Sequence, residues 1–256
     1  MKLGNAKGFS RSAGLGAFVL LFSWSIHAQT QSWRTEKPMA ALTVKVSSLQ
    51  HLQLYLYDEK KQPYLSFERL SSALDHQCQR MQFAMNAGMF HADFSPVGLY
   101  VEDAKQLHAL NRVKQGFGNF LIQPNGVLAW SDRKAVIQTT DQFAQSRFKP
   151  QFATQSGPML VIDGKINPNF LRDASSRKIR NGVGLKGQAL YFVISREPVT
   201  FYQFAAYFKN TLNIDHALYL DGSLSSIYDA QLKVHDAFRP LGPMLAYSTA
   251  PACGIN

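Results

Sequence analysis

Four short polar segments combine residue types that can bind and cleave a small polar substrate. Each borders an apolar run, and each contains glycine, which lets the backbone approach a ligand closely or adopt a positive φ. Together they bring an amide, hydroxyls, a guanidinium and a carboxylate, a set that suits a sugar joined to a phosphate. The segments are Asn86-Ala87-Gly88-Met89-Phe90-His91 with Asp93 beyond it, Gln155-Ser156-Gly157-Pro158, Arg180-Asn181-Gly182-Val183-Gly184, and the loop that begins at Asp221.

The Asp221 loop is the strongest candidate for the reactive group. An apolar run of strand type, 217–220, stops at this carboxylate, and glycine follows at once. A buried strand that ends in a polar loop fixes the backbone and presents the acid in a cleft. Asp-Gly is also a common tight-turn dipeptide, so a turn without chemistry is the alternative. The residues after the acid are Gly222, Ser223, Leu224, Ser225 and Ser226.

Other site chemistries fit the sequence less well. Ser156 is not in a Gly-x-Ser-x-Gly elbow, which disfavours an α/β-hydrolase triad. His91 and Asp93 form a His-x-Asp pair that could ligate a metal ion, but two such residues also occur together in ordinary polar loops. Gly182-x-Gly184 is too short a pattern for a dinucleotide site. We therefore expect no metal and no cofactor.

The first 28 residues have the order of a secretory signal peptide. A basic segment without acidic residues precedes an apolar run, 13–26, and Ala28 is a small residue at the expected cleavage site. The apolar run is short for a bilayer span, so an uncleaved anchor is the less favoured alternative. The sequence predicts a periplasmic or secreted protein, with no stable membrane insertion after the signal is removed.

Positive charge in the chain is scattered. Removal of Lys2, Lys7 and Arg11 with the signal lowers the formal net charge from +10 to +7. Without a basic run or aromatic-basic interleaving, nucleic acid is an unlikely partner for an exported protein. A small sugar-phosphate or glycan substrate fits better. The one local basic cluster is Arg172, Arg177, Lys178 and Arg180.

Residues 29–256 are expected to form one domain, because their number suits one core and no linker or repeat divides them. The chain has two cysteines, Cys78 and Cys253. In an oxidising compartment such a pair most simply forms a disulfide, and two free buried thiols are the alternative.

Short strands separated by turns dominate the predicted elements. A helix is expected at 66–77, and Thr200 with Gln203 predicts a capping box before an apolar helical stripe, interpreted as core, that starts at Phe201. Hairpins with a few helices indicate an α+β domain with mixed, mostly antiparallel sheets. The expected strands are 42–46, 52–57, 82–85, 96–101, 106–110, 120–123, 127–130, 158–162, 165–166, 183–185, 189–195 and 217–220.

The four segments, taken in order, resemble the motifs of the phosphodiester glycosidase family. This family includes the lysosomal enzyme that removes N-acetylglucosamine from a mannose phosphodiester. The resemblance covers about 82–226 and implies a hydrolase of sugar-1-phosphodiesters. By motif it assigns site positions to Asn86, Gly88, Ser156, Gly157, Arg180, Asp221, Gly222, Ser223 and Ser225. Two residues depart from the family pattern: Asn181 stands where Thr is usual, and Ser223 stands where a second Gly is usual.

The resemblance implies a division of roles. Arg180 would pair bidentately with the phosphodiester, and Asp221 would act at the anomeric carbon as nucleophile or base. His91 or Asp93 would assist as a proton carrier. The remaining polar site residues would bind sugar hydroxyls or phosphate oxygens. A non-catalytic envelope module that binds glycan or anionic polymer, and a structural envelope protein, are the alternatives from other classes.

Overall fold

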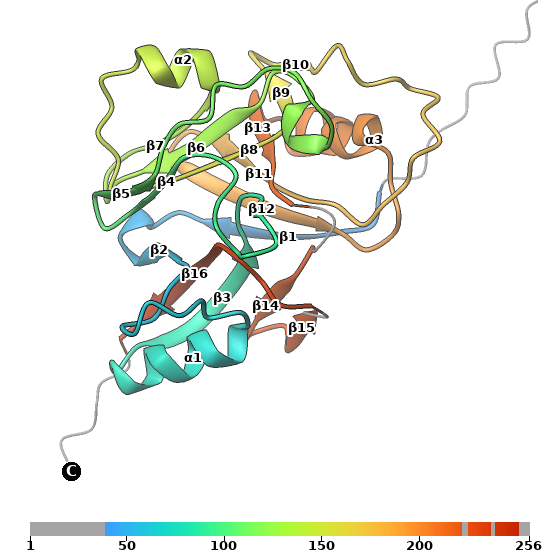
Figure 1. Ribbon diagram of the computed structural model, residues 1–256. Coiled ribbons are helices and arrows are strands. Elements are labelled where there is room, and N and C mark those ends of the chain that lie inside the picture. Colours follow the sequence, from blue (N-terminus) through green and yellow to red (C-terminus); the bar gives the residue numbers. More distant parts are fainter. Residues whose placement is uncertain (1–38, 222–224, 237–238, 251–256) are drawn as a thin grey trace, which may run out of the picture. The chain divides into compact units, whose positions relative to one another are not determined.

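The computed structural model describes residues 39–221, 225–236 and 239–250 (Figure 1). These residues belong to one compact unit, Pro38–Asn256. The predicted signal peptide, Gly222, Ser223 and Cys253 lie outside the described residues. No helix in the described part of the chain is long and apolar enough to cross a membrane.

The strands of the described residues form three sheets, and every pairing between neighbours is antiparallel. The predicted α+β class with mostly antiparallel sheets is confirmed. The first sheet has the order β1-β12-β11-β13-β9-β10. Its strands are β1 (Ala41–Val46), β12 (Ala189–Ser195), β11 (Asn181–Lys186), β13 (His216–Tyr219), β9 (Met159–Ile162) and β10 (Lys165–Ile166).

The second sheet has the order β15-β14-β3-β16-β2, and β16 lies between two strands from the beginning of the described chain. Its strands are β15 (Val234–Asp236), β14 (Ile227–Asp229), β3 (Arg80–Asn86), β16 (Met244–Thr249) and β2 (Leu52–Tyr55). The third sheet has the order β5-β4-β8-β6-β7. Its strands are β5 (Lys105–His108), β4 (Tyr100–Glu102), β8 (Phe152–Ser156), β6 (Gly126–Trp130) and β7 (Ala135–Thr139).

Side chains from all three sheets share one hydrophobic core. Trp130 is fully buried there, and its indole N–H donates to the carbonyl of Leu52 at 2.8 Å, so the polar atom of this large side chain is satisfied. The core thereby ties the third sheet to the second. The strands whose ends carry the candidate site residues pack in this common core.

The helices are short, and the capping box predicted at Thr200 is confirmed. Helix α1 (Phe67–His76) has Ser66 as N-cap and packs its apolar face on β3 (Figure 1). Helix α3 (Phe201–Ala206) begins with the predicted capping box of Thr200 and Gln203 and continues as a π-helical turn, η3 (Tyr207–Thr211). Helix α2 (Thr140–Gln145) follows β7 directly. Two 3₁₀ turns complete the set: η1 (Leu49–His51) and η2 (Asn119–Leu121).

Glycine in β11 allows α3 and η3 to pack directly on the first sheet. A Cβ atom at Gly184 would lie 2.8 Å from side-chain carbons of Phe208 and Ile214. Such a distance is below any ordinary carbon contact, so a larger residue would push the helical segment away from the sheet. The glycine-rich strand is therefore explained first by packing.

One predicted hairpin is wrong. The sequence places strands at 120–123 and 127–130 around Pro124-Asn125-Gly126, but 119–121 form η2, and β6 pairs with β7 and β8 instead. Asn125 is buried, and its side chain bonds to Phe120 and Thr140 rather than serving a turn. Tertiary hydrogen bonds therefore override the local turn preference of Asn-Gly.

Other predicted hairpins are confirmed. β9 and β10 are joined by Asp163 and Gly164, both at positive φ, and β11 pairs with β12 across the turn that contains Gly187. β4 pairs with β5, with the turn at Asp103 and Ala104, one residue later than the predicted Glu102-Asp103.

Candidate functional site

Two buried asparagines join the strand ends around Asp221. Asn181, at the start of β11, accepts a hydrogen bond from the backbone N–H of Asp221 at 3.0 Å and donates to Asn86 Oδ1 at 2.8 Å. Asn86, at the end of β3, donates to the carbonyl of Asp221 at 3.0 Å and accepts from the N–H of Ser226 at 2.8 Å. Both asparagine side chains are almost completely buried. The pair fixes the backbone on both sides of the Asp221 loop.

Two of the predicted serines also bond to the backbone of this region. Ser156, at the end of β8, is fully buried and donates to the carbonyl of Leu220 at 2.5 Å. Ser225 donates to the carbonyl of Ile179 at 3.3 Å. The structure thus brings the four motif segments to one place, although the first and last are more than 130 residues apart in the chain.

Gly88 lies tightly against β8. Its N–H donates to Thr154 Oγ1 at 3.2 Å, and a Cβ atom at this position would lie 2.5 Å from the carbonyl oxygen of Gln155. Only glycine lets the two backbones come this close. Gly157 is similarly packed against the side chain of Asn125.

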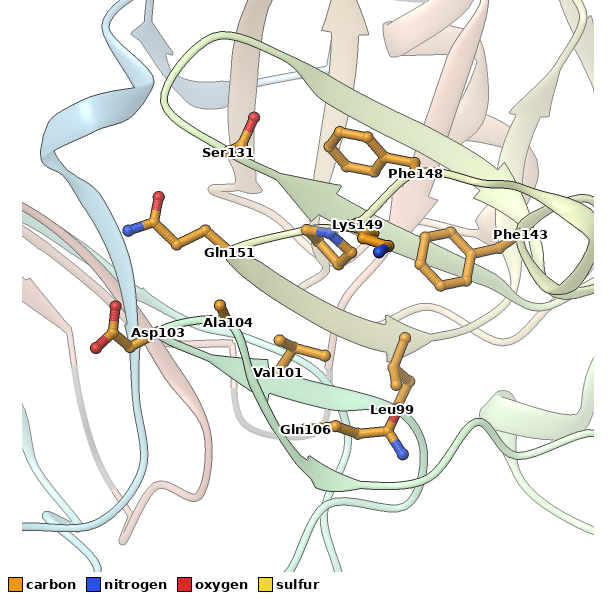
Figure 2. A pocket seen from close by; sticks show the side chains of 11 residues that line it. Leu99, Val101, Asp103, Ala104, Gln106, Ser131, Phe143, Phe148, Lys149 and Gln151 are labelled. Atoms are coloured by element: carbon orange, nitrogen blue, oxygen red, sulfur yellow. The ribbon is translucent and has the colours of Figure 1, made fainter.

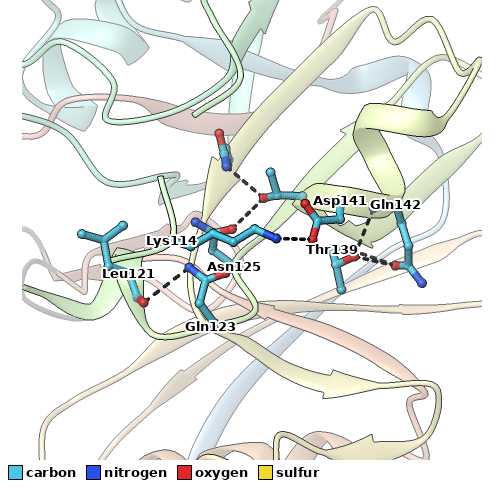
Figure 3. A network of polar contacts seen from close by, with 9 residues as sticks. Lys114, Leu121, Gln123, Asn125, Thr139, Asp141 and Gln142 are labelled. Atoms are coloured by element: carbon cyan, nitrogen blue, oxygen red, sulfur yellow. Dashed lines mark hydrogen bonds and ion pairs between the residues drawn. The ribbon is translucent and has the colours of Figure 1, made fainter. Parts of the chain in front are cut away.

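A second buried network supports the strand that carries Ser156. The side chain of Gln155 donates to Thr140 Oγ1 at 2.9 Å and to the carbonyl of Asn111 at 2.7 Å. Thr140 donates in turn to Asn125 Oδ1 at 2.7 Å, and Asn125 donates to the carbonyl of Phe120 at 3.2 Å. Figure 3 shows Asn125 within this network. These bonds order the loops that flank the end of β8.

Arg180 is the most unusual residue of the site. Only 2% of its surface is exposed, and its guanidinium lies over the ring of Phe201, 3.7 Å from the ring centroid. Its Nε donates to the carbonyl of Val199 at 2.9 Å and its Nη2 to that of Ser176 at 3.3 Å. Nη1 is buried and has no hydrogen-bond partner. Burial lowers the pKa of this guanidinium, with Tyr219 acting in the opposite direction, and arginine stays cationic in proteins.

Arg180 and Asp221 lie at adjacent strand ends. β11 and β13 pair with Gly182 opposite Tyr219, and the N–H of Leu220 donates to the carbonyl of Asn181 at 3.2 Å. Continued in the same register, Arg180 stands opposite Asp221. Asp221 is 8% exposed, so both candidate groups occupy a largely dry environment.

His91 and Asp93 belong to the loop after β3. Asp93 is exposed and accepts bonds from the hydroxyl and the N–H of Ser95, at 2.6 and 3.0 Å. These bonds lower the pKa of Asp93, which keeps it ionised near neutral pH and disfavours a role as a general acid. The hydrogen bonds that the described residues show for His91 also stay within this loop. In the described ranges, no group of three or more His, Cys, Asp or Glu could hold a metal ion.

A separate cavity of about 660 Å³ lies on the third sheet (Figure 2). Leu99 and Val101 line it from β4 and its approach, and Phe143 and Phe148 line it from α2 and the segment that follows. None of the predicted site residues lines this cavity. It is therefore distinct from the strand ends around Asp221.

Sequence reasoning missed part of the site. It assigned Phe201 to the core stripe of α3, whereas this ring also contacts Arg180. It assigned Asn86, Asn181 and Ser156 to substrate, and the structure shows them bonded to protein groups. Direct contact of these three with a ligand stays a prediction. The same holds for Gly222 and Ser223, which lie outside the described residues.

The profile of the phosphodiester glycosidase family matches residues 79–248. The chain belongs to this family. The matched range contains all four motif segments and the strands that carry them, so the resemblance inferred from the motifs is confirmed.

Two comparisons place this phosphodiester glycosidase family member among known proteins. The chain is 39% identical over 181 residues to the uncharacterized protein YigE of Escherichia coli strain K12, covering 70% of each chain. Its fold is similar to the catalytic domain of zebrafish N-acetylglucosamine-1-phosphodiester alpha-N-acetylglucosaminidase, solved in a form auto-inhibited by its pro-peptide. The TM-score is 0.54 at 12% identity, over 84% of each chain. This second likeness concerns the fold alone.

Proposed function

We propose that the chain hydrolyses a sugar-1-phosphodiester at the bond between the anomeric carbon and the phosphate oxygen. Asp221 acts at the anomeric carbon, and Arg180 binds the phosphate. The family match supports phosphodiester glycosidase activity in general. The residue roles are our own assignment.

The observation that carries the assignment is the unpaired Nη1 of Arg180. A buried charge is costly unless it is paired and hydrogen-bonded, and the ion pairs among the described residues do not include Arg180. A phosphate oxygen would supply the missing acceptor and the missing negative charge. The expected bidentate contact cannot use Nε, because that N–H is already bonded to Val199.

The proposed chemistry needs one well-placed carboxylate. In ordinary glycosidases a second carboxyl group protonates a poor leaving group. A phosphomonoester leaves more readily than an alcohol, so the electron pair of the breaking C–O bond goes to a phosphate oxygen that Arg180 stabilises. The carboxylate of Asp221 either attacks the anomeric carbon or removes a proton from the attacking water. Retention or inversion at the anomeric carbon distinguishes these two courses.

The test measures free sugar by NMR after incubation with a panel of sugar-1-phosphodiesters, beginning with N-acetylglucosamine-α-1-phosphate esters. Wild type is compared with Asp221→Asn and Arg180→Ala, each with and without a chelator. Arg177→Ala is the matched control, because Arg177 comes from the same segment but is exposed and bonds to Gln203. We expect release by wild type and the control and a loss of about 10²–10⁴-fold in Asp221→Asn.

The alternative function, a glycan or anionic-polymer binding module, gives a different result. Wild type would then bind the esters saturably, Arg180→Ala would weaken binding, and no sugar would appear. Full activity of a folded Asp221→Asn protein would refute the role of Asp221 without refuting hydrolysis.

We also propose that residues 1–28 are removed on export to the periplasm or the medium, and that Cys78 forms a disulfide with Cys253. The basic and apolar order of the first segment supports export. The intact mass of protein from the envelope fraction should match a chain that begins at Gln29 and has no free thiol. A full-length chain retained in membranes, or two alkylated cysteines without reductant, would contradict these two proposals respectively.

A further inference from the structure

The guanidinium of Arg180 forms one layer of an aromatic stack. Phe201 lies beneath it at 3.7 Å, and Phe170 stacks on Phe201 with ring centroids 5.1 Å apart and an angle of 12° between the rings. Tyr219 meets Phe201 edge to face at 4.9 Å. These rings come from the connection between β10 and β11, from the first turn of α3 and from the end of β13. Rings from two of these segments, Phe201 and Tyr219, lie against the guanidinium, and Phe170 supports Phe201.

The backbone bonds of Arg180 fix the rest of its orientation. Nε and Nη2 donate to carbonyls of Val199 and Ser176, and the ring of Phe201 restricts the plane of the guanidinium. Nη1 is buried and has no hydrogen-bond partner. An arginine in an open pocket would sample several rotamers and would lose entropy on binding an anion.

We propose that Phe201 is a positioning residue: its ring holds the Arg180 guanidinium in the one orientation that presents Nη1 to a phosphate group. This inference rests on the phosphate-binding role of Arg180 in the proposed function. Cation–π attraction is strongest for desolvated cations, and Arg180 is nearly completely buried, so the ring contributes substantially to that orientation. Phe201 then acts on affinity for the anion through Arg180, without touching the anion.

The chain offers a matched control for this role. Phe204 lies one turn further along α3, is fully buried in the same apolar cluster and packs edge to face on Phe208 at 5.3 Å. Phe204→Leu therefore removes a ring from the same helix while the stack on Arg180 remains. Phe201→Leu removes the stacked ring, and Phe201→Tyr keeps it.

The experiment titrates inorganic phosphate into each mature protein and follows the side-chain N–H resonance of Arg180, assigned by its absence in Arg180→Lys. In the free protein, the ring current of Phe201 should shift this resonance in wild type, Phe201→Tyr and Phe204→Leu, and the shift should be lost in Phe201→Leu. The Kd for phosphate should rise about tenfold in Phe201→Leu and change little in the other two ring variants.

Each outcome bears on one assignment. An unchanged resonance in Phe201→Leu, or a Kd no weaker than that of Phe204→Leu, overturns the positioning role. Absence of phosphate binding by wild type, or equal binding by Arg180→Ala, overturns both this inference and the phosphate role of Arg180. Phosphate binding that depends on Phe201 without sugar release supports the inference while hydrolysis fails.

Discussion

The two buried amide networks have the same chemistry and different neighbours. Asn125, Thr140 and Gln155 bond to one another and to loop carbonyls, and their polar atoms serve the packing of the third sheet. Asn86 and Asn181 are bonded as completely, but they hold the backbone of Asp221 beside an arginine with an unused donor. Buried amides in a motif therefore do not by themselves mark ligand contacts. The phosphate role proposed for Arg180 rests instead on its unused donor.

The largest loss of activity is expected from Asn181→Ala. The substitution removes the acceptor of the Asp221 N–H and a donor to Asn86, so the acid loses its fixed position. Misplacement by about 1 Å is enough to lower kcat by on the order of 10²-fold. Sugar release and urea unfolding should be measured together. Activity that falls no more than the folded fraction does would show that the pair is only structural.

Gln155→Ala tests the other network. It removes the hydrogen-bond partner of the Leu99 N–H, the Asn111 carbonyl and the Thr140 hydroxyl. We expect the free energy of unfolding to fall by about 2–4 kcal/mol. The kcat of the remaining folded protein should change less than tenfold, because Asp221 keeps its own supports. A loss of kcat as large as in Asn181→Ala would mean that the two networks act as one.

Gly88→Ala tests the close contact between the loop after β3 and strand β8. The new methyl group would overlap Thr154 Oγ1 and the carbonyl of Gln155, which belongs to β8 and cannot move freely. The expected destabilisation is about 1–3 kcal/mol. Thermal unfolding of the purified variant measures it, and a melting temperature equal to that of wild type would show that the β3–β4 loop adapts.

The smallest effect is expected for Glu102, a half-buried acid that lies beside a tyrosine instead of an arginine. Burial raises its pKa above the ordinary value of 4.5, although the Tyr100 hydroxyl, which donates to it at 2.7 Å, acts in the opposite direction. Because the folded state holds the proton more tightly, the stability from this group is present below the unfolded pKa and is lost as the pH rises through the folded one.

Wild type should therefore lose stability relative to Glu102→Gln as the pH rises from about 4 to 7. Chemical unfolding at several pH values checks this, with the exposed Glu59→Gln as control. A constant difference between wild type and Glu102→Gln would contradict the raised pKa.

Local signals predicted much of the fold. The helix expected at 66–77 forms, Thr200 caps its helix as predicted, and Asp163-Gly164 forms its turn, because each depends on neighbours within a few residues. Asn125-Gly126 does not form the predicted turn, because the buried side chain of Asn125 accepts a hydrogen bond from the Thr140 hydroxyl in α2 instead. Strands β7, β8, β14, β15 and β16 were not predicted. Of these, β8 and β16 pair only with strands that lie far away in the chain.

The structure joins Asn86, Ser156 and Asn181 from three of the motifs to the backbone at 220–221. The hydrogen bonds shown for His91 and Asp93 stay within their own loop. The motifs did not predict how each side chain is used. Whether Asn86 faces a ligand or the loop 135 residues later depends on the assembled sheets. The contact of Phe201 with Arg180 was hidden for the same reason, because a helical apolar stripe looks alike whether or not a cation lies on it.

The central position of β16 has a consequence for synthesis. β2 and β3 do not pair with each other, and each needs β16, which leaves the ribosome after every other described strand. The second sheet therefore cannot close, and Asn86 at the end of β3 cannot be fixed in place, until β16 has been made. Pairing over such sequence separations is slow. The second sheet should thus be the last of the three to close, because the other two contain only strands that precede β14.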